Sequence, residues 1–217
     1  MSKIRLQFSK TGTLRFIGHL DFLRVFQQTI RRAGLPSAFS QGFNPHLLIS
    51  FALPLPLGME SVNDYADIVL EEEVAAGEII KRLNAAAPDG LVVKKAYPVE
   101  NKAASIVKIA DYIVRGGESS KVRSTAEEGR VGEFLQAAEI IVAKKTKKGV
   151  KDTDIRADIF DLRFVGGDLH MRLSAGSERF LNPLIVAGLV FGEGVSPSAV
   201  SRMELYREDE RGGSVTL

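Results

Sequence analysis

The hydrophobic pattern of the first hundred residues switches between a two-residue and a 3.6-residue period, and this switching restricts the folds open to the chain. Ile4, Leu6 and Phe8 alternate with polar residues, which indicates a strand with one buried face. From about Gly18 to Gly34 the apolar residues recur with helical spacing. The pattern then predicts strands over 47–57 and 65–70, a helix over 72–86 and a strand over 91–96.

This order, β-α-β-β-α-β, is that of the ferredoxin-like fold. The second half is compatible with the same order, with predicted strands at 107–114, 140–143, 159–165, 169–173 and 200–206 and predicted helices at 131–138 and 180–191. We therefore predict an α+β protein of two ferredoxin-like units in tandem, each an antiparallel sheet with helices on one face. The predicted domains are 1–98 and 99–206, with 207–217 as a flexible tail. A single larger α+β domain is the alternative.

Charge and cysteine content exclude several classes of site. The 217 residues include 29 Lys and Arg against 27 Asp and Glu, a net charge of +2, so any argument for nucleic-acid binding depends on local clusters. There is no cysteine, which excludes disulfides, thiolate zinc sites and an iron–sulfur cluster held by this chain. No phosphate-binding loop, dinucleotide fingerprint or zinc-protease motif occurs, and we predict no cofactor. Without a signal segment or a membrane-length apolar run, we expect a cytoplasmic protein.

His19 and Asp21 begin the first predicted helix. The positive end of a helix dipole favours a neutral imidazole, so His19 is a candidate general acid–base or metal ligand that Asp21 could orient. The alternative is structural: a hydrogen-bonding histidine followed by an acid that favours the first helical turn.

Arginines follow the same helix. Arg24, Arg31 and Arg32, with Arg15 upstream, could form a ladder of guanidinium groups suited to phosphates. The alternative is a solvated helix face. The ladder would make these four residues substrate-binding.

A polar loop, Ser40 to His46, combines hydrogen-bonding side chains, a glycine and an aromatic ring. Ser40, Gln41 and Asn44 suit ligand binding, and Phe43 could stack on a base. His46 could meet His19 across the fold as a second catalytic group. Two histidines with Asp21 could bind a divalent metal, but we predict no metal site. The alternative is a tight connection with Phe43 in the core.

The densest positive charge lies between Ile140 and Asp152, where five lysines occur without an acid. These are Lys144, Lys145, Lys147, Lys148 and Lys151. On a hairpin they would attract polyanions with strong salt dependence; the alternative is a solubilising loop. His170, within a predicted strand, is interpreted as structural.

Motifs along most of the chain, residues 2–206, resemble a known family. The residues that carry the resemblance are Phe8-Ser9-Lys10, Arg15-Phe16, His19-Leu20-Asp21, Arg24, Arg31-Arg32-Ala33-Gly34, Ser40 to His46, Ser50-Phe51, Leu57-Gly58 and Asp152 to Arg156. The sequence is similar to the radical-SAM-linked protein family (DUF2344), which occurs beside, or fused behind, B12-binding radical SAM proteins. The family usually has a serine where Gly18 stands, so no hydroxyl role is carried over there.

The resemblance implies a separately encoded radical SAM partner and a setting in RNA modification or processing. Our first hypothesis is an RNA-binding or substrate-presenting accessory, with Arg156 joining the lysines as a nucleic-acid contact and no catalysis by this chain alone. The second, by fold analogy with CRISPR repeat-processing nucleases, is a metal-independent endoribonuclease using His19 and His46. The third is an adaptor that binds only protein. The oligomeric state is left open.

Overall fold

A computed structural model of the chain describes residues 1–101, 103–115, 125–146, 149–192, 194–208 and 213–217. Its first part contains β1 (Ser2–Lys10), η1 (Gly12–Phe16), α1 (His19–Arg32), β2 (Ile49–Phe51), β3 (Glu60–Leu70), α2 (Ala76–Ala86) and β4 (Leu91–Pro98). Its second part contains α3 (Ala103–Ile106), β5 (Ile109–Val114), α4 (Thr125–Gln136), β6 (Ile141–Thr146), β7 (Gly149–Asp154), η3 (Arg156–Asp158), β8 (Ile159–Val165), β9 (Asp168–Ser174), α5 (Pro183–Phe191), η4 (Pro197–Ala199), β10 (Val200–Glu208) and β11 (Ser214–Thr216).

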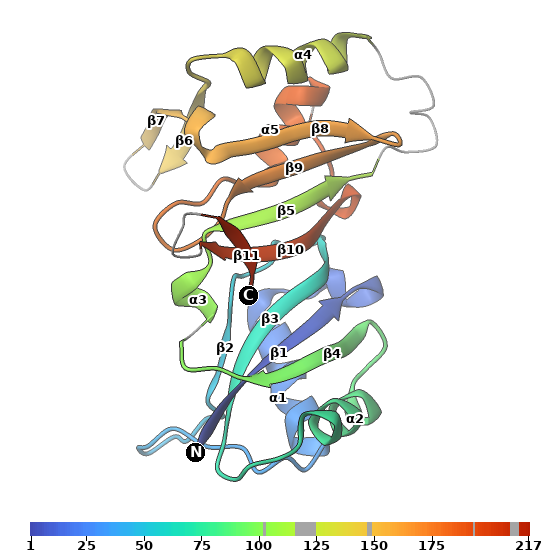
Figure 1. Cartoon of the computed structure of the whole chain (residues 1–217), viewed down its shortest axis with the longest axis vertical. Helices are drawn as coiled ribbons and strands as arrows, with labels where there is room; N and C mark the ends of the chain where they lie inside the picture. The colour runs from blue at the N-terminus through green and yellow to red at the C-terminus, as the bar shows by residue number, and fades with distance from the viewer. Residues whose placement is uncertain (102, 116–124, 147–148, 193, 209–212) are drawn as a thin grey trace.

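The chain is a mixed α/β protein with one long, mostly antiparallel sheet (Figure 1). The strand order is β4-β1-β3-β10-β5-β9-β8, with β2 paired to β3 and β11 paired to β10. The first and second parts of the chain meet where β10 runs parallel to β3, with Ser201 opposite Glu60 and Arg202 opposite Ser61. Strands β6 and β7 form a separate two-stranded sheet.

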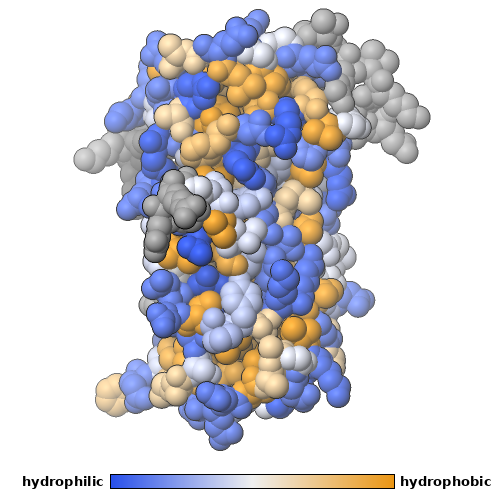
Figure 2. Space-filling view, viewed as in Figure 1, coloured by the Kyte–Doolittle hydropathy of each residue, from blue (hydrophilic) through white to orange (hydrophobic). Residues whose placement is uncertain are grey.

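The two faces of this sheet differ in chemistry. On β1, the alternate residues Ile4, Leu6 and Phe8 are buried in a core that includes side chains of α1 and α2. A second core forms under β5, β8, β9 and β10 against α5. In Figure 1, α1 and α5 lie behind the strands, which face the viewer. Figure 2, in the same view, shows hydrophilic residues spread across this face between smaller apolar patches.

The end of the chain adds to the sheet. The charged, Gly/Ser-rich composition of residues 207–217 predicts a flexible tail, whereas β10 extends to Glu208 and Ser214–Thr216 pair with it as β11. The backbone hydrogen bonds of this register give Ser214–Thr216 a strand conformation that the composition of the segment does not suggest. In the described part of the chain, no helix is long and apolar enough to cross a membrane.

Candidate functional site

Aromatic side chains hold α1 against the sheet, and this sets the direction of its arginines. The Phe22 and Phe26 rings lie 5.9 Å and 5.2 Å from the ring of Phe8 on β1. Both rings also lie 5.4 Å from that of Phe51 on β2. With this face buried, the helical period turns the arginine positions toward solvent.

Arg31 and Arg32 are exposed in the last turn of α1. Within the described residues, neither side chain has a hydrogen bond or ion pair. The carbonyl of Ala33, which follows the helix, is instead bound by Arg82 of α2, whose Nε donates to it over 2.8 Å. The end of the helix is therefore satisfied without Arg31 and Arg32, and both guanidinium groups are available to a ligand.

The other two arginines of the predicted ladder are engaged. Arg24 forms an ion pair of 2.7 Å with Asp21, and both side chains are mostly in solvent. Arg15 donates to the Gly58 carbonyl over 3.0 Å and lies 3.2 Å from the Glu60 carboxylate. It also donates to the Ser198 carbonyl in the second part of the chain. Arg15 is thus a structural cross-link, and the ladder contracts to the end of α1.

The loop from Ser40 to His46 is braced at its base. The Ser40 Oγ lies 2.8 Å from His46 Nδ1 and accepts the His46 backbone N–H over 3.1 Å. The Ser40 N–H donates to the His46 carbonyl over 2.8 Å. Gly42 has φ 121°, a conformation that side chains rarely adopt. Phe43 is fully exposed at the tip, contrary to the core alternative, and Gln41 and Asn44 are exposed beside it.

His19 and His46 are not brought together. The His19 ring contacts Phe51, with 5.5 Å between ring centroids. His46 lies five residues before Phe51 on an extended segment, a span of about 16 Å. In the described part of the chain, no group of three or more histidine, aspartate or glutamate side chains is placed to hold a metal.

Strands β6 and β7 carry the lysine-rich segment. Lys144 lies opposite Lys151, and Lys151 is exposed. Lys145 lies on β6, while Lys147 and Lys148 lie outside the described residues.

Arg156, the sixth predicted nucleic-acid contact, is engaged with backbone carbonyls. Its guanidinium donates to Ala137 over 3.2 Å, to Ile159 over 3.0 Å and to Leu135 over 2.8 Å. These bonds tie the end of α4 to the start of β8, so Arg156 has a structural role in this conformation.

Three buried charged residues near the junction of the sheet are absent from the residues predicted to form the site. They are Lys10 on β1, Asp64 on β3 and Arg202 on β10. The alternation that buries Ile4, Leu6 and Phe8 also places Lys10 on the buried face, so a signal for Lys10 existed. Asp64 and Arg202 had no comparable signal, because their pairing joins positions 138 residues apart.

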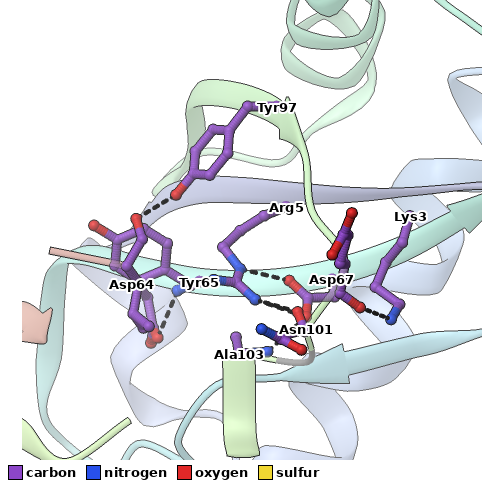
Figure 3. Close-up of polar contacts among 10 residues, drawn as sticks. Lys3, Arg5, Asp64, Tyr65, Asp67, Tyr97, Asn101 and Ala103 are labelled. Atoms are coloured by element: carbon purple, nitrogen blue, oxygen red, sulfur yellow. Dashed lines mark hydrogen bonds and ion pairs between the residues drawn. The ribbon is translucent and has the colours of Figure 1, made fainter. Parts of the chain in front are cut away.

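Polar contacts on the opposite face join the two parts of the chain (Figure 3). Arg5 pairs with Asp67, with Nε–Oδ1 and Nη2–Oδ2 distances of 2.8 Å and 3.2 Å, and donates to the Asn101 carbonyl over 2.7 Å. Asp67 also accepts the backbone N–H of Ala103 over 2.7 Å. The buried pair thus anchors the segment that enters the second part of the chain.

A cavity of about 190 Å³ lies on the face of β5 and β9 that is turned away from α5 (Figure 1). Arg172 pairs with Asp111 through two hydrogen bonds of 2.7 Å and 2.8 Å, and its guanidinium lies 4.7 Å from the Tyr206 ring. Burial, and then the hydrogen bond to Asp111, raise the pKa of Tyr206 to about 12. His170 lines this cavity together with Arg163. The cavity combines cations and carboxylates, so it has no single sign of charge.

Comparison with known proteins shows the family to which this chain belongs. A solved structure described as "Crystal Structure of an Unknown Protein from Galdieria sulphuraria" is 11% identical, with a TM-score of 0.27 over 80% of this chain and 79% of that chain, and at this score it carries no argument about fold or function. No curated protein matches the chain. The family model described as "Uncharacterized protein conserved in bacteria (DUF2344)" matches residues 3–183, and the chain therefore belongs to this family.

Proposed function

We propose that this protein is an RNA-binding accessory that presents substrate to a separate radical SAM enzyme, without catalysis of its own. The observation that carries the proposal is the fully exposed Phe43 at the tip of a braced loop, which residues 33–39 connect to the unpaired Arg31 and Arg32 at the end of α1. This placement follows from the register. The segment leaving α1 pairs through Ser37 with Leu70, the last residue of β3, and the loop comes next in the chain.

Single-stranded RNA fits these groups. An aromatic ring stacks on any base, and such stacking is worth about 1–3 kcal/mol per base. A guanidinium binds two phosphate oxygens at once. Gln41 and Asn44, exposed beside Phe43, supply donors and acceptors for base edges.

The radical SAM partner is implied by the resemblance described above. A chain without cysteine cannot ligate an iron–sulfur cluster through thiolates, so radical chemistry would belong to that partner. We place the complex in the cytoplasm. The lysine-rich hairpin of β6 and β7 would be a second, electrostatic contact with the RNA.

We further infer that each part of the chain is a ferredoxin-like unit, with domains at 1–98 and 99–206. Support comes from the strand order, because β4-β1-β3-β2 in the first part has the same relative order as β10-β5-β9-β8 in the second. The division of the buried residues into two clusters also supports it. The β6–β7 hairpin would then be an insertion in the second unit.

The test measures retention of total cellular RNA by the purified protein across a salt series, with sequencing of the retained RNA and its ends. We expect Arg31→Glu with Arg32→Glu to weaken retention at least tenfold and to lower the salt dependence by about 0.7 per lost phosphate contact. Phe43→Ala should weaken retention without changing the salt dependence, since stacking involves no counterion release. Lys81→Glu with Lys95→Glu, two exposed cations elsewhere, is the charge-matched control.

Each other outcome counts against the proposal. If the wild-type protein retains no RNA at low salt, the hypothesis of an adaptor that binds only protein replaces this proposal. If the control pair weakened RNA retention equally, the effect of the arginine substitutions would be explained by net charge alone. Cleaved RNA ends would favour the endoribonuclease, although the separation of His19 from His46 leaves that hypothesis without an acid–base pair in this conformation.

A further inference from the structure

Three polar residues form a row across the buried face of the sheet, where its two parts meet. Lys10 on β1 pairs in register with Ser61 on β3, and Ser61 pairs with Arg202 on β10. Their exposed fractions are 2%, 0% and 0%. A lysine and an arginine are almost never so buried without an anionic partner each.

Arg202 also contacts the buried Tyr112 hydroxyl, yet two donors of the row are left without an acceptor. Arg202 donates through its two Nη atoms to Pro54 O, Leu53 O and Asp64 Oδ2, over 3.2 Å, 2.9 Å and 2.6 Å. Its Nε–H has no partner, and neither does the Ser61 hydroxyl. Such orphaned buried donors are costly and call for an acceptor.

Lys10 adds further donors. Its Nζ donates to the Ile17 carbonyl over 3.1 Å and lies 4.8 Å from the centre of the Phe22 ring. An ammonium group has three N–H donors, so these contacts leave capacity unused.

The charge of the row is unbalanced as well. Lys10 and Arg202 are two cations, and Asp64 is the carboxylate between them. Each Asp64 oxygen accepts one hydrogen bond, Oδ2 from Arg202 and Oδ1 from the Tyr65 N–H at 2.9 Å. Burial lowers the pKa of Lys10; the charge of Asp64 opposes this, and the smaller effect of the Arg202 charge adds to it. With both cations charged, these three groups carry a net charge of +1, which one monovalent anion would neutralise.

We propose that this row binds a small inorganic anion of the size of chloride, held by Lys10 Nζ, the Ser61 hydroxyl and Arg202 Nε–H. Such an ion accepts from each unsatisfied donor and supplies the missing negative charge. Because Ser61 and Arg202 belong to β3 and β10, the ion stabilises the short parallel contact between the two parts of the chain. Large or multiply charged anions are excluded by the burial of the row.

Thermal unfolding of the full chain at constant ionic strength tests the site, with chloride replacing gluconate, an anion too large to be buried there. We expect the midpoint to rise by about 3–5 °C for each tenfold increase in chloride above the dissociation constant. Lys10→Met balances the charge of the row and should abolish this rise, and Ser61→Ala should weaken it. Lys95→Met, which removes an exposed lysine of β4, should retain it in full.

Bromide provides a readout that needs no variant. Crystals of the wild-type protein grown in bromide should show one anomalous peak within hydrogen-bond distance of Ser61 and Arg202. Equal midpoints in chloride and gluconate, or a rise that persists in Lys10→Met, would overturn the proposal. In that case Lys10 is held as a neutral amine and the orphaned donors bind water.

Discussion

Glu204 connects the two parts of the chain through its single carboxylate. One oxygen accepts from the Tyr65 hydroxyl over 2.6 Å, and the other accepts from Asn63 Nδ2 over 3.1 Å. Burial raises the pKa of Glu204 and outweighs these hydrogen bonds, which act in the opposite direction. The folded protein therefore binds a proton at Glu204 more tightly than the unfolded chain does.

The pH dependence of stability should show this proton. Between the ordinary glutamate pKa and the raised one, the folded state binds more protons, so the free energy of unfolding falls as pH rises through that window. We expect Glu204→Gln to lack this fall, so that the stability of wild type relative to the variant declines with rising pH. Urea unfolding of both proteins from pH 4 to 7.5 measures this difference in the free energy of unfolding. If the two free energies changed in parallel with pH, the raised pKa of Glu204 would be contradicted.

At the scale of the element, α1 depends on its aromatic face. Phe26 is 1% exposed and contacts the rings of Phe8, Phe22 and Phe51. The same element carries Arg31 and Arg32 on its other side, so the packing of these rings determines where the proposed RNA contacts lie.

Phe26→Ala should lower the free energy of unfolding by about 3–5 kcal/mol, since it removes a large buried side chain and leaves a cavity. Phe43→Ala, the matched control, should change it by less than about 0.5 kcal/mol because Phe43 packs against nothing. Chemical denaturation of both variants checks the contrast. A comparable loss in Phe43→Ala would place that ring in a core and remove it from the proposed site.

Elements with a strong hydrophobic period could be predicted, and those determined by long-range pairing could not. The helical spacing from Gly18 to Gly34 predicted α1 closely. The strand expected over 47–57 shortens to Ile49–Phe51, because Pro54 and Pro56 cannot donate to a ladder. In contrast, β3 begins at Glu60, five residues before the expected start. Ser61 in this extension pairs with Lys10 of β1 and with Arg202 of β10, and no local sequence pattern shows these pairings.

The candidate site was predictable to a similar degree. Glycine and polar residues around Phe43 indicated a loop but left open whether its ring lies in the core, and the structure places the ring in solvent. The guanidinium ladder was only partly realised, because local spacing cannot show that Arg15 reaches Ser198, 183 residues away in the chain. Tertiary contacts determine which arginines remain available to a ligand, and helical spacing in the sequence does not show these contacts.

For the whole molecule, the two proposed RNA contacts lie far apart. In Figure 1 the hairpin of β6 and β7 lies beside the upper part of the sheet, while the segment before β2 lies at the lower end. Four strand spacings, about 19 Å, separate β3 from β8 in the sheet. An RNA that contacts both regions must therefore extend beyond about six stacked nucleotides, at roughly 3.4 Å each.

RNA length should consequently decide which variants matter. Lys144→Glu with Lys151→Glu should weaken binding of a 30-nucleotide RNA at least tenfold and leave that of a six-nucleotide RNA unchanged. Arg31→Glu with Arg32→Glu should weaken both. Fluorescence anisotropy with labelled oligonucleotides measures the four affinities. Equal weakening of the short RNA by the hairpin variant would show that one region, and not two, contacts the nucleic acid.

The pairing of Arg202 with Asp64 also has a consequence for biosynthesis. The ribosome makes Asp64 well before its partner, because 138 residues separate them, and at about 5–20 residues per second this interval lasts roughly 7–28 s. During that time the nascent first part carries an unpaired carboxylate on β3, close to the edge at Glu60 and Ser61 where β10 will later pair. Water must hydrate that edge until translation delivers β10, so the two parts of the sheet can join only after almost the whole of this sequence has been synthesised.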